Sequence, residues 1–200
     1  IEHKHFYDIT DYFGENDVLV LNNTKVIPAR LFGRKNTGAH IEVFLLKQIG
    51  DKTWEVLINP SKRVKEESII EISPDLYVKV LTRKNEGKWL VELHYDGNFY
   101  EILDKVGNIP LPPYIERTMT DEQLKNLDYD RYQTVYAQIE GSVAAPTAGL
   151  HFTQEILKKL EEKGVQICYV TLNVGLGTFR PVKVDNILAV SYTHLRAHET

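Results

Sequence analysis

Between Leu31 and Leu103 the sequence is a series of short apolar or alternating runs, and this feature limits the fold more than any other. Turn-forming residues such as Asn, Gly, Pro, Asp and Ser separate the runs. About five or six strands at this spacing indicate a small all-β barrel or sandwich. The expected strands cover residues 41–46, 53–58, 68–72, 76–81 and 89–95.

The segments on either side of this β region have a different pattern, in which buried strands alternate with helices. Residues 17–21 and 165–172 are continuous apolar runs typical of buried strands, and each is followed by a loop. Thr153 is the expected N-cap of a helix that ends near Lys163, before Gly164. The alternation predicts an α/β main domain. We assign it residues 1–30 and 106–189, with 31–105 as an inserted β-barrel domain.

The composition is that of a soluble globular protein, with 42% hydrophobic and 26% charged residues. No apolar run approaches the roughly 20 residues of a membrane span. The single cysteine, Cys168, excludes an internal disulfide and a cysteine-based zinc site. We therefore expect a cytoplasmic protein with no metal site and no membrane partner.

The net charge of −4 does not indicate a generic nucleic-acid-binding protein, which usually has a strong basic excess. The central part of the chain nevertheless contains two small basic groups, which are interpreted either as solvated strand edges or as a local patch. Their members are Arg30, Arg34 and Lys35 in the first group and Lys62, Arg63 and Lys65 in the second.

The last eleven residues, 190–200, read VSYTHLRAHET. We interpret this string as a translated sequencing-library adaptor, so it is set aside in predicting the fold. The first residue is Ile1 and not Met. From these two observations we expect a chain cut at both ends, with a non-native tail.

Three stretches of sequence are unusual enough to indicate a family. They read VLNNTKVIPARLFG at 20–33, YQTVYA at 132–137 with GSVAAPTAGLHFT at 141–153, and VTLNVGLGTFRPV at 170–182. Residues 1–189 resemble the S-adenosylmethionine:tRNA ribosyltransferase-isomerase family of queuosine biosynthesis. The resemblance implies an α/β barrel-like main domain with an inserted all-β small-barrel domain. One position departs from the family pattern, because Asn173 stands where the family often has His.

The resemblance also implies a reaction. Family members move the ribosyl moiety of S-adenosylmethionine onto 7-aminomethyl-7-deazaguanine in tRNA, giving epoxyqueuosine and releasing adenine and methionine. S-adenosylmethionine is then a co-substrate, no cofactor is bound permanently, and tRNA carrying a 7-deazaguanine base is the partner. We expect a monomer. Because family members extend beyond both ends of the matched region, we expect this chain alone to be inactive.

The implied chemistry needs a general base, because the sulfonium makes the C5′ protons acidic. His151 is one candidate, since histidine titrates near neutrality; its alternative role is a packed loop residue before the helix. Glu140, beside a Gly-Ser turn, is the second candidate. It could act as the base or hold the sulfonium, and the alternative is a solvated helix end.

Substrate contacts are expected from polar and small residues in the loops that follow the buried strands, because strand ends of one sheet share a rim. We expect residues 22–25, 145–151 and 175–179 to converge on one cleft. The alternatives are tight loop packing for the small residues, a salt bridge for Arg30 and core packing for Tyr136. The expected substrate-binding residues are Asn22, Asn23, Thr24, Lys25, Arg30, Tyr136, Ser142, Ala145, Pro146, Thr147, Gly149, Asn173, Gly175, Gly177, Thr178 and Phe179.

Two other classes of protein were weighed against this interpretation. A conventional methyltransferase would show a glycine-rich turn after its first strand, whereas this strand leads into Asn22, Asn23 and Thr24. The other is a non-catalytic RNA-binding module that uses the β region as a platform, through basic and aromatic surfaces.

Overall fold

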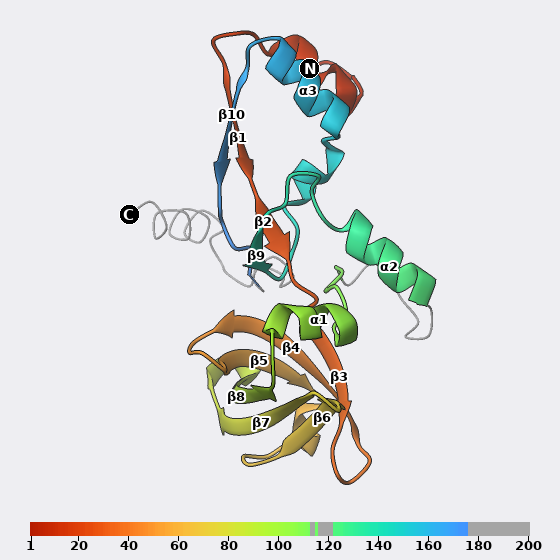
Figure 1. Cartoon of the computed structure of the whole chain (residues 1–200), viewed down its shortest axis with the longest axis vertical. Helices are drawn as coiled ribbons and strands as arrows, with labels where there is room; N and C mark the ends of the chain where they lie inside the picture. The colour runs from red at the N-terminus through yellow and green to blue at the C-terminus, as the bar shows by residue number, and fades with distance from the viewer. Residues whose placement is uncertain (113–114, 116–121, 176–200) are drawn as a thin grey trace.

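The computed structural model describes residues 1–112, 115 and 122–175, and its central feature is a closed antiparallel β-barrel (Figure 1). The strand order is β3-β4-β5-β8-β7-β6, and the pairing of Arg34 with Glu71 closes the barrel between β3 and β6. The sequence prediction of a small all-β barrel is confirmed. The strands are β3 (Arg30–Arg34), β4 (His40–Gln48), β5 (Thr53–Asn59), β6 (Ile69–Ser73), β7 (Leu76–Arg83) and β8 (Lys88–Tyr95).

Alternation along each strand fills the barrel interior with apolar side chains. Val43, Val56 and Val91 are fully buried, whereas their neighbours on each strand face outward. Gly33 permits the closure, because a Cβ there would lie 2.5 Å from the carbonyl oxygen of Glu71 on β6. A larger residue at this position would push the closing strand away.

A helix that the sequence analysis missed, α1 (Phe99–Val106), covers one end of the barrel (Figure 1). It begins at Asn98, whose side chain accepts hydrogen bonds from the backbone N–H groups of Tyr100 and Glu101. Phe99 places its ring 5.5 Å from that of Trp54. The buried side chains of α1 thereby continue the core of the barrel.

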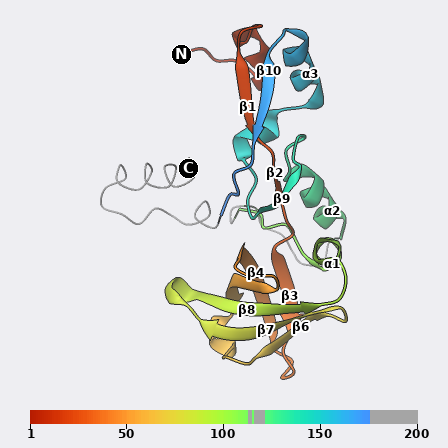
Figure 2. The same cartoon turned by 60° about the vertical axis from the view of Figure 1, so that its left-hand side comes forward.

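Outside the barrel, four strands form two separate two-stranded parallel sheets. β1 (Val18–Asn22) pairs with β10 (Gln166–Val170), and β2 (Thr24–Val26) pairs with β9 (Ile139–Ser142). In both views the two sheets follow one another along the long axis, with the barrel at one end (Figures 1 and 2).

The expected α/β barrel-like main domain is therefore wrong for the part of the chain that the structure describes. β2 and β9 are three and four residues long, and neither pairs with any other strand of the described residues. Two pairs of strands this short leave no continuous sheet that could curve into a barrel. β1, α3 and β10 lie close to the ranges predicted from sequence, but such an alternation of strands and helices does not determine how the strands assemble.

Helices cover one face of the β1–β10 sheet. The 3₁₀ helix η1 (Phe6–Tyr12) and α3 (Gln154–Glu162) pack there, with Leu21, Leu157 and Leu160 among the buried residues. The predicted start of α3 is confirmed, because the Thr153 side chain accepts a hydrogen bond from the N–H of Ile156. The opposite face carries Val18, Val20 and Val170, which are 52%, 56% and 42% exposed.

The remaining helices are short. α2 (Glu122–Arg131) lies beside the second sheet, near α1 (Figures 1 and 2), and a helix start at Thr120 lies outside the described residues. Three further 3₁₀ helices are η2 (Ser61–Arg63), η3 (Asn85–Gly87) and η4 (Thr147–His151). In the described part of the chain, no helix is long and apolar enough to cross a membrane.

Candidate functional site

The polar loop after β1 is held against the segment after β10 by the side chain of Asn22. Its Oδ1 accepts from the N–H of Leu172 at 3.0 Å and from that of Thr24 at 3.2 Å. Its Nδ2 donates to the carbonyl of Leu172 at 2.9 Å. Because β1 and β10 are parallel, their carboxyl ends meet at one edge, and Asn22 joins the two loops that leave it.

Two further side chains from the same loop are buried and bonded to the segment after β10. Asn23 is 7% exposed, and its Oδ1 accepts from Oγ1 of Thr171 at 2.7 Å. Thr24 is 1% exposed and donates from Oγ1 to Oδ1 of Asn173 at 2.9 Å. Residues 22–24 thus contact the segment after β10, while the expected convergence of 22–25, 145–151 and 175–179 on one cleft stays a prediction, since 176–179 lie outside the described residues.

Lys25 and Glu140 form an ion pair, 3.1 Å between Nζ and Oε1, across the β2–β9 sheet. Both side chains are about one-third exposed, at 30% and 31%. Burial lowers the pKa of Lys25, but the hydrogen bond to Glu140 and the nearby Tyr129, Glu140 and Asp104 outweigh it, so the pKa is raised. Lys25 is thus a cation and not a proton acceptor at neutral pH.

Ser142 connects β9 to the segment after β10. Its fully buried Oγ accepts from the N–H of Val174 at 2.8 Å and lies 2.9 Å from the carbonyl of Ala144, to which it donates. The preceding Gly141 has φ +143°, and a Cβ there would lie 3.1 Å from Nδ2 of Asn173. A side chain at 141 would therefore press on the residue that holds Thr24.

Gln133 is a site residue that the sequence analysis missed. Its side-chain amide makes two hydrogen bonds with the backbone of Val26: Oε1 accepts from N–H at 3.0 Å and Nε2 donates to the carbonyl at 2.7 Å. The amide therefore takes the place of a neighbouring strand beside β2. Gln133 lies in the YQTVYA stretch, but nothing in its local sequence predicts a contact 107 positions away.

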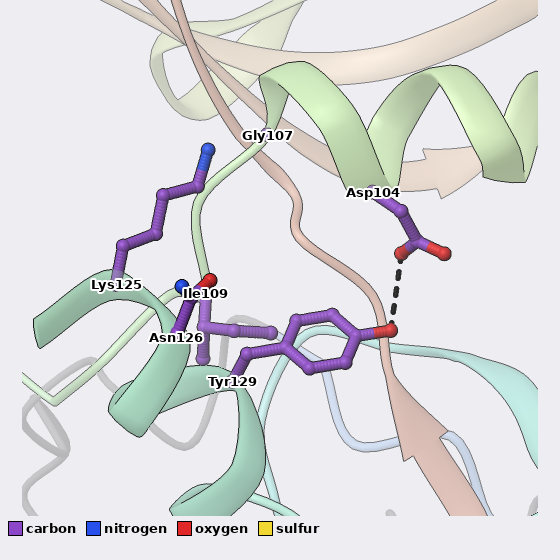
Figure 3. A pocket seen from close by; sticks show the side chains of 6 residues that line it. All are labelled: Asp104, Gly107, Ile109, Lys125, Asn126 and Tyr129. Atoms are coloured by element: carbon purple, nitrogen blue, oxygen red, sulfur yellow. Dashed lines mark hydrogen bonds between the residues drawn. The ribbon is translucent and has the colours of Figure 1, made fainter. Parts of the chain in front are cut away.

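A pocket of about 280 Å³ adjoins the ion pair, and it too was missed (Figure 3). The Tyr129 hydroxyl donates to Oδ1 of Asp104 at 3.1 Å across it. The pKa of Tyr129 is raised by burial and by Asp104, and the positive charge of Lys25 acts in the opposite direction. The pocket is lined by Asp104, Gly107, Ile109, Lys125, Asn126 and Tyr129.

The loop of small residues after β9 is mainly packed. Ala145 is 3% exposed and contacts the apolar cluster of Val26 and Tyr132. Gly149 is needed for packing, because a Cβ would lie 2.2 Å from the hydroxyl of Tyr136. Tyr136 itself is 7% exposed and belongs to the core beneath β1. Pro146 is half-buried and Thr147 is exposed.

The two expected catalytic residues lie in different surroundings. Glu140 belongs to the polar network, through Lys25. His151 is exposed at the end of η4, with its ring 5.1 Å from that of Phe6 on η1. The contacts of His151 are thus with the N-terminal helix, and its predicted role remains a prediction.

The other expected residues divide between the barrel and the C-terminal segment. Arg30 lies on β3, where it pairs with Glu42 at 2.8 Å, as in its alternative interpretation. Gly175 is exposed with open space around it. Gly177, Thr178 and Phe179 lie outside the described residues, as does the segment 190–200. Within the described ranges, no group of three His, Cys, Asp or Glu side chains is placed to hold a metal ion.

The chain thus combines a closed β-barrel with a polar network at the ends of parallel strands. Residues 1–195 match the family model described as queuosine biosynthesis protein, an interval that includes part of the segment interpreted as an adaptor. This chain belongs to that family.

One solved structure to which the chain is similar is the S-adenosylmethionine tRNA ribosyltransferase of Thermotoga maritima. The sequences are 30% identical, and the match covers 86% of this chain with a TM-score of 0.32. The matched region is 46% of the Thermotoga chain, so this chain spans about half the length of that relative.

Proposed function

We propose that this chain supplies the binding site for S-adenosylmethionine and tRNA in a ribosyltransferase-isomerase. The observation that carries the proposal is the network formed by residues 22–25, Glu140, Ser142 and Asn173, in a chain of the queuosine biosynthesis family. The network lies where parallel strands end, which is a common place for ligands in α/β proteins.

The proposed reaction moves the ribosyl moiety of S-adenosylmethionine onto the aminomethyl nitrogen of 7-aminomethyl-7-deazaguanine in tRNA. The C5′–sulfur bond and the C1′–adenine bond break, so that methionine and adenine leave, adenine with a proton. The ribosyl carbons close into an epoxycyclopentane ring bonded to the aminomethyl nitrogen, which gives up a proton, and the modified base is epoxyqueuosine. S-adenosylmethionine acts as a co-substrate. Since the relative is about twice as long as the matched region, we propose that turnover needs residues beyond these 200.

The ion pair of Lys25 and Glu140 suits the charges of these substrates. S-adenosylmethionine has a positive sulfonium and a negative carboxylate, and tRNA has negative phosphates. Glu140 attracts the sulfonium, and Lys25, which remains protonated, attracts a carboxylate or a phosphate. Because each side chain is about one-third exposed, a ligand can reach both.

Two residues are candidates for the general base. Glu140 is already in the network, and a carboxylate there can both hold the sulfonium and accept a C5′ proton. His151 lies beside Phe6 and would act from the η4 side of the site.

The experiment that tests the proposal uses two proteins. The 200-residue chain is titrated with S-adenosylmethionine, and we expect Glu140→Gln to weaken binding. A chimera, in which this chain replaces the matched part of the Thermotoga enzyme, is incubated with S-adenosylmethionine and tRNA containing the 7-aminomethyl base. Mass spectrometry of the tRNA should show the ribosyl-derived addition, with release of adenine and methionine.

Several outcomes would contradict the proposal. A methylated tRNA would show that the methyl group is transferred instead. A folded chimera without product, in an assay where the Thermotoga enzyme itself turns over, would show that these residues do not form the site. Tight tRNA binding that S-adenosylmethionine never affects, again without product, would favour an RNA-binding module.

A further inference from the structure

Two basic groups that are well separated in the sequence lie against each other on the barrel. Nζ of Lys35, just after β3, donates a hydrogen bond of 2.9 Å to the carbonyl oxygen of Arg63, 28 positions later in η2. This bond uses one of the three N–H donors of Lys35. Arg34 precedes it, and Lys62 and Lys65 flank Arg63, so five basic residues gather at one place.

One carboxylate, that of Glu71 on β6, lies opposite Arg34 in the strand pairing that closes the barrel, but no ion pair between the two is found in the part of the chain that the structure describes. Among the described residues, none of the five forms an ion pair. The closest acidic residues in sequence are used elsewhere: Glu67 pairs with Lys79 at 2.9 Å, and Glu66 accepts from the hydroxyl of Thr82 at 2.7 Å. Arg30 differs from the five, because its charge is matched by Glu42.

The basic cluster is accessible and lies away from the polar network. Arg34, Lys62, Arg63 and Lys65 are exposed, and Lys35 is half-buried. The turn that follows β3 projects at the end of the barrel opposite to α1 and to the two parallel sheets (Figures 1 and 2). A ligand that touches both this cluster and the network must therefore be a large molecule.

We propose that Arg34, Lys35, Lys62, Arg63 and Lys65 form a surface that binds the phosphate backbone of RNA. Unpaired, exposed Lys and Arg side chains gain most from a polyanion, because each phosphate that they neutralise releases condensed counterions. Such interactions fix the position of the nucleic acid without reading its sequence. The identity of the RNA as tRNA rests on the proposed function.

The test compares two double variants of the 200-residue chain that remove the same charge. Arg34→Gln with Arg63→Gln removes two members of the cluster whose side chains have no ion pair among the described residues. The control, Lys47→Gln with Lys159→Gln, removes two exposed lysines from β4 and α3. Binding of an unmodified tRNA transcript is measured by fluorescence anisotropy from about 0.05 to 0.3 M salt, over which phosphate binding changes affinity strongly.

We expect the cluster variant to bind about tenfold more weakly at low salt, and the salt slope to fall by about one for each phosphate that is no longer neutralised. The control should bind as the unaltered chain does. Equal reductions in both variants, or none in the cluster variant, would overturn the proposed surface while leaving the proposed function intact. Absence of any tRNA binding by the unaltered chain would count against both. Binding to anionic lipid vesicles, with none to tRNA, would overturn the RNA assignment.

Discussion

Thr24 donates its hydroxyl hydrogen to Oδ1 of Asn173, at 2.9 Å and across 149 positions of sequence. Thr24 is 1% exposed, so this bond supplies the partner that a buried hydroxyl needs. The amide oxygen of Asn173 acts as an acceptor that fixes the loop after β10 against β2.

Removing this acceptor should destabilise the protein. In Asn173→Ala the Thr24 hydroxyl loses its partner, and we expect the free energy of unfolding to fall by about 1–3 kcal/mol, measured by urea denaturation. Thr24→Val removes the donor. The double variant should lose less free energy of unfolding than the sum of the losses in the two single variants, by at least about 0.5 kcal/mol. Losses that simply add would show that the hydrogen bond contributes nothing to stability.

Ser142 should be more sensitive to truncation than an exposed serine. Ser142 is fully buried, and Ser142→Ala leaves the N–H of Val174, a half-buried residue, without its acceptor. We expect a loss of about 1–3 kcal/mol in the free energy of unfolding. The matched control is Ser73→Ala, since Ser73 accepts only the exposed N–H of Asp75. Losses of equal size in the two variants would contradict the assignment of Ser142 as a connection between β9 and the segment after β10.

The ion pair of Lys25 and Glu140 should contribute a pH-dependent stability. Because folding raises the pKa of Lys25 above its ordinary value of 10.5, the contribution is complete below that pH and is lost as the pH rises through the folded value. Lys25→Met should therefore lose less stability than the unaltered chain above about pH 10.5. Exposure of about one-third limits the pair to roughly 0–1 kcal/mol. If the free energies of unfolding of Lys25→Met and of the unaltered chain changed equally with pH in alkali, the pH-dependent contribution of the ion pair would be contradicted.

The His151 assignment is tested in the chimera with the Thermotoga enzyme. If His151 is the general base, His151→Ala should lower kcat by about 10²–10⁴-fold and leave S-adenosylmethionine binding almost unchanged. Phe6→Leu is the control, because it disturbs the ring contact without removing the imidazole. Near-normal turnover of His151→Ala, or an equal loss in Phe6→Leu, would show that His151 has a packing role.

Limited proteolysis should leave the barrel as the most resistant part of the chain. Its six strands are all paired, and α1 covers one end. The β1–β10 sheet has only two strands and an exposed apolar face, which favours local opening. We expect a protected fragment near residues 31–105, identified by mass spectrometry. Early cleavage inside the barrel, with residues outside it intact, would contradict the expectation.

The barrel was predictable from sequence because the signals for its strands and turns lie in short, local stretches of the chain. Alternation decides which side chains of β5 and β8 face inward, and Asn, Gly and Pro mark the turns. The α/β barrel-like domain failed for the opposite reason. Whether β2 pairs with β9, and with no other described strand, depends on contacts between residues more than 100 positions apart.

The polar loop after β1 could likewise be located from local sequence alone. The polar run 22–25 is conspicuous after an apolar strand, and it was predicted to contact substrate; its hydrogen bonds to the segment after β10 were not predicted. Gln133 and Tyr129 gave no such signal, since each acts through a partner distant in sequence, the backbone of Val26 and the carboxylate of Asp104. Chemistry-bearing residue types can be recognised in a sequence, whereas the residues that position them are recognised only once the chain is folded.

The chain enters and leaves the barrel at the same point, where Arg30 and Asn108 exchange backbone hydrogen bonds of 3.1 and 2.9 Å. Gly107 permits this close approach, because a Cβ there would lie 2.1 Å from the carbonyl of Pro28. The flanking segments therefore need no more than a short connection to be rejoined. A module attached in this way can be exchanged or lengthened at small entropic cost, since loop closure depends only weakly on length. The six strands of the barrel are thus the part of the described structure in which large variation would disturb the polar network least.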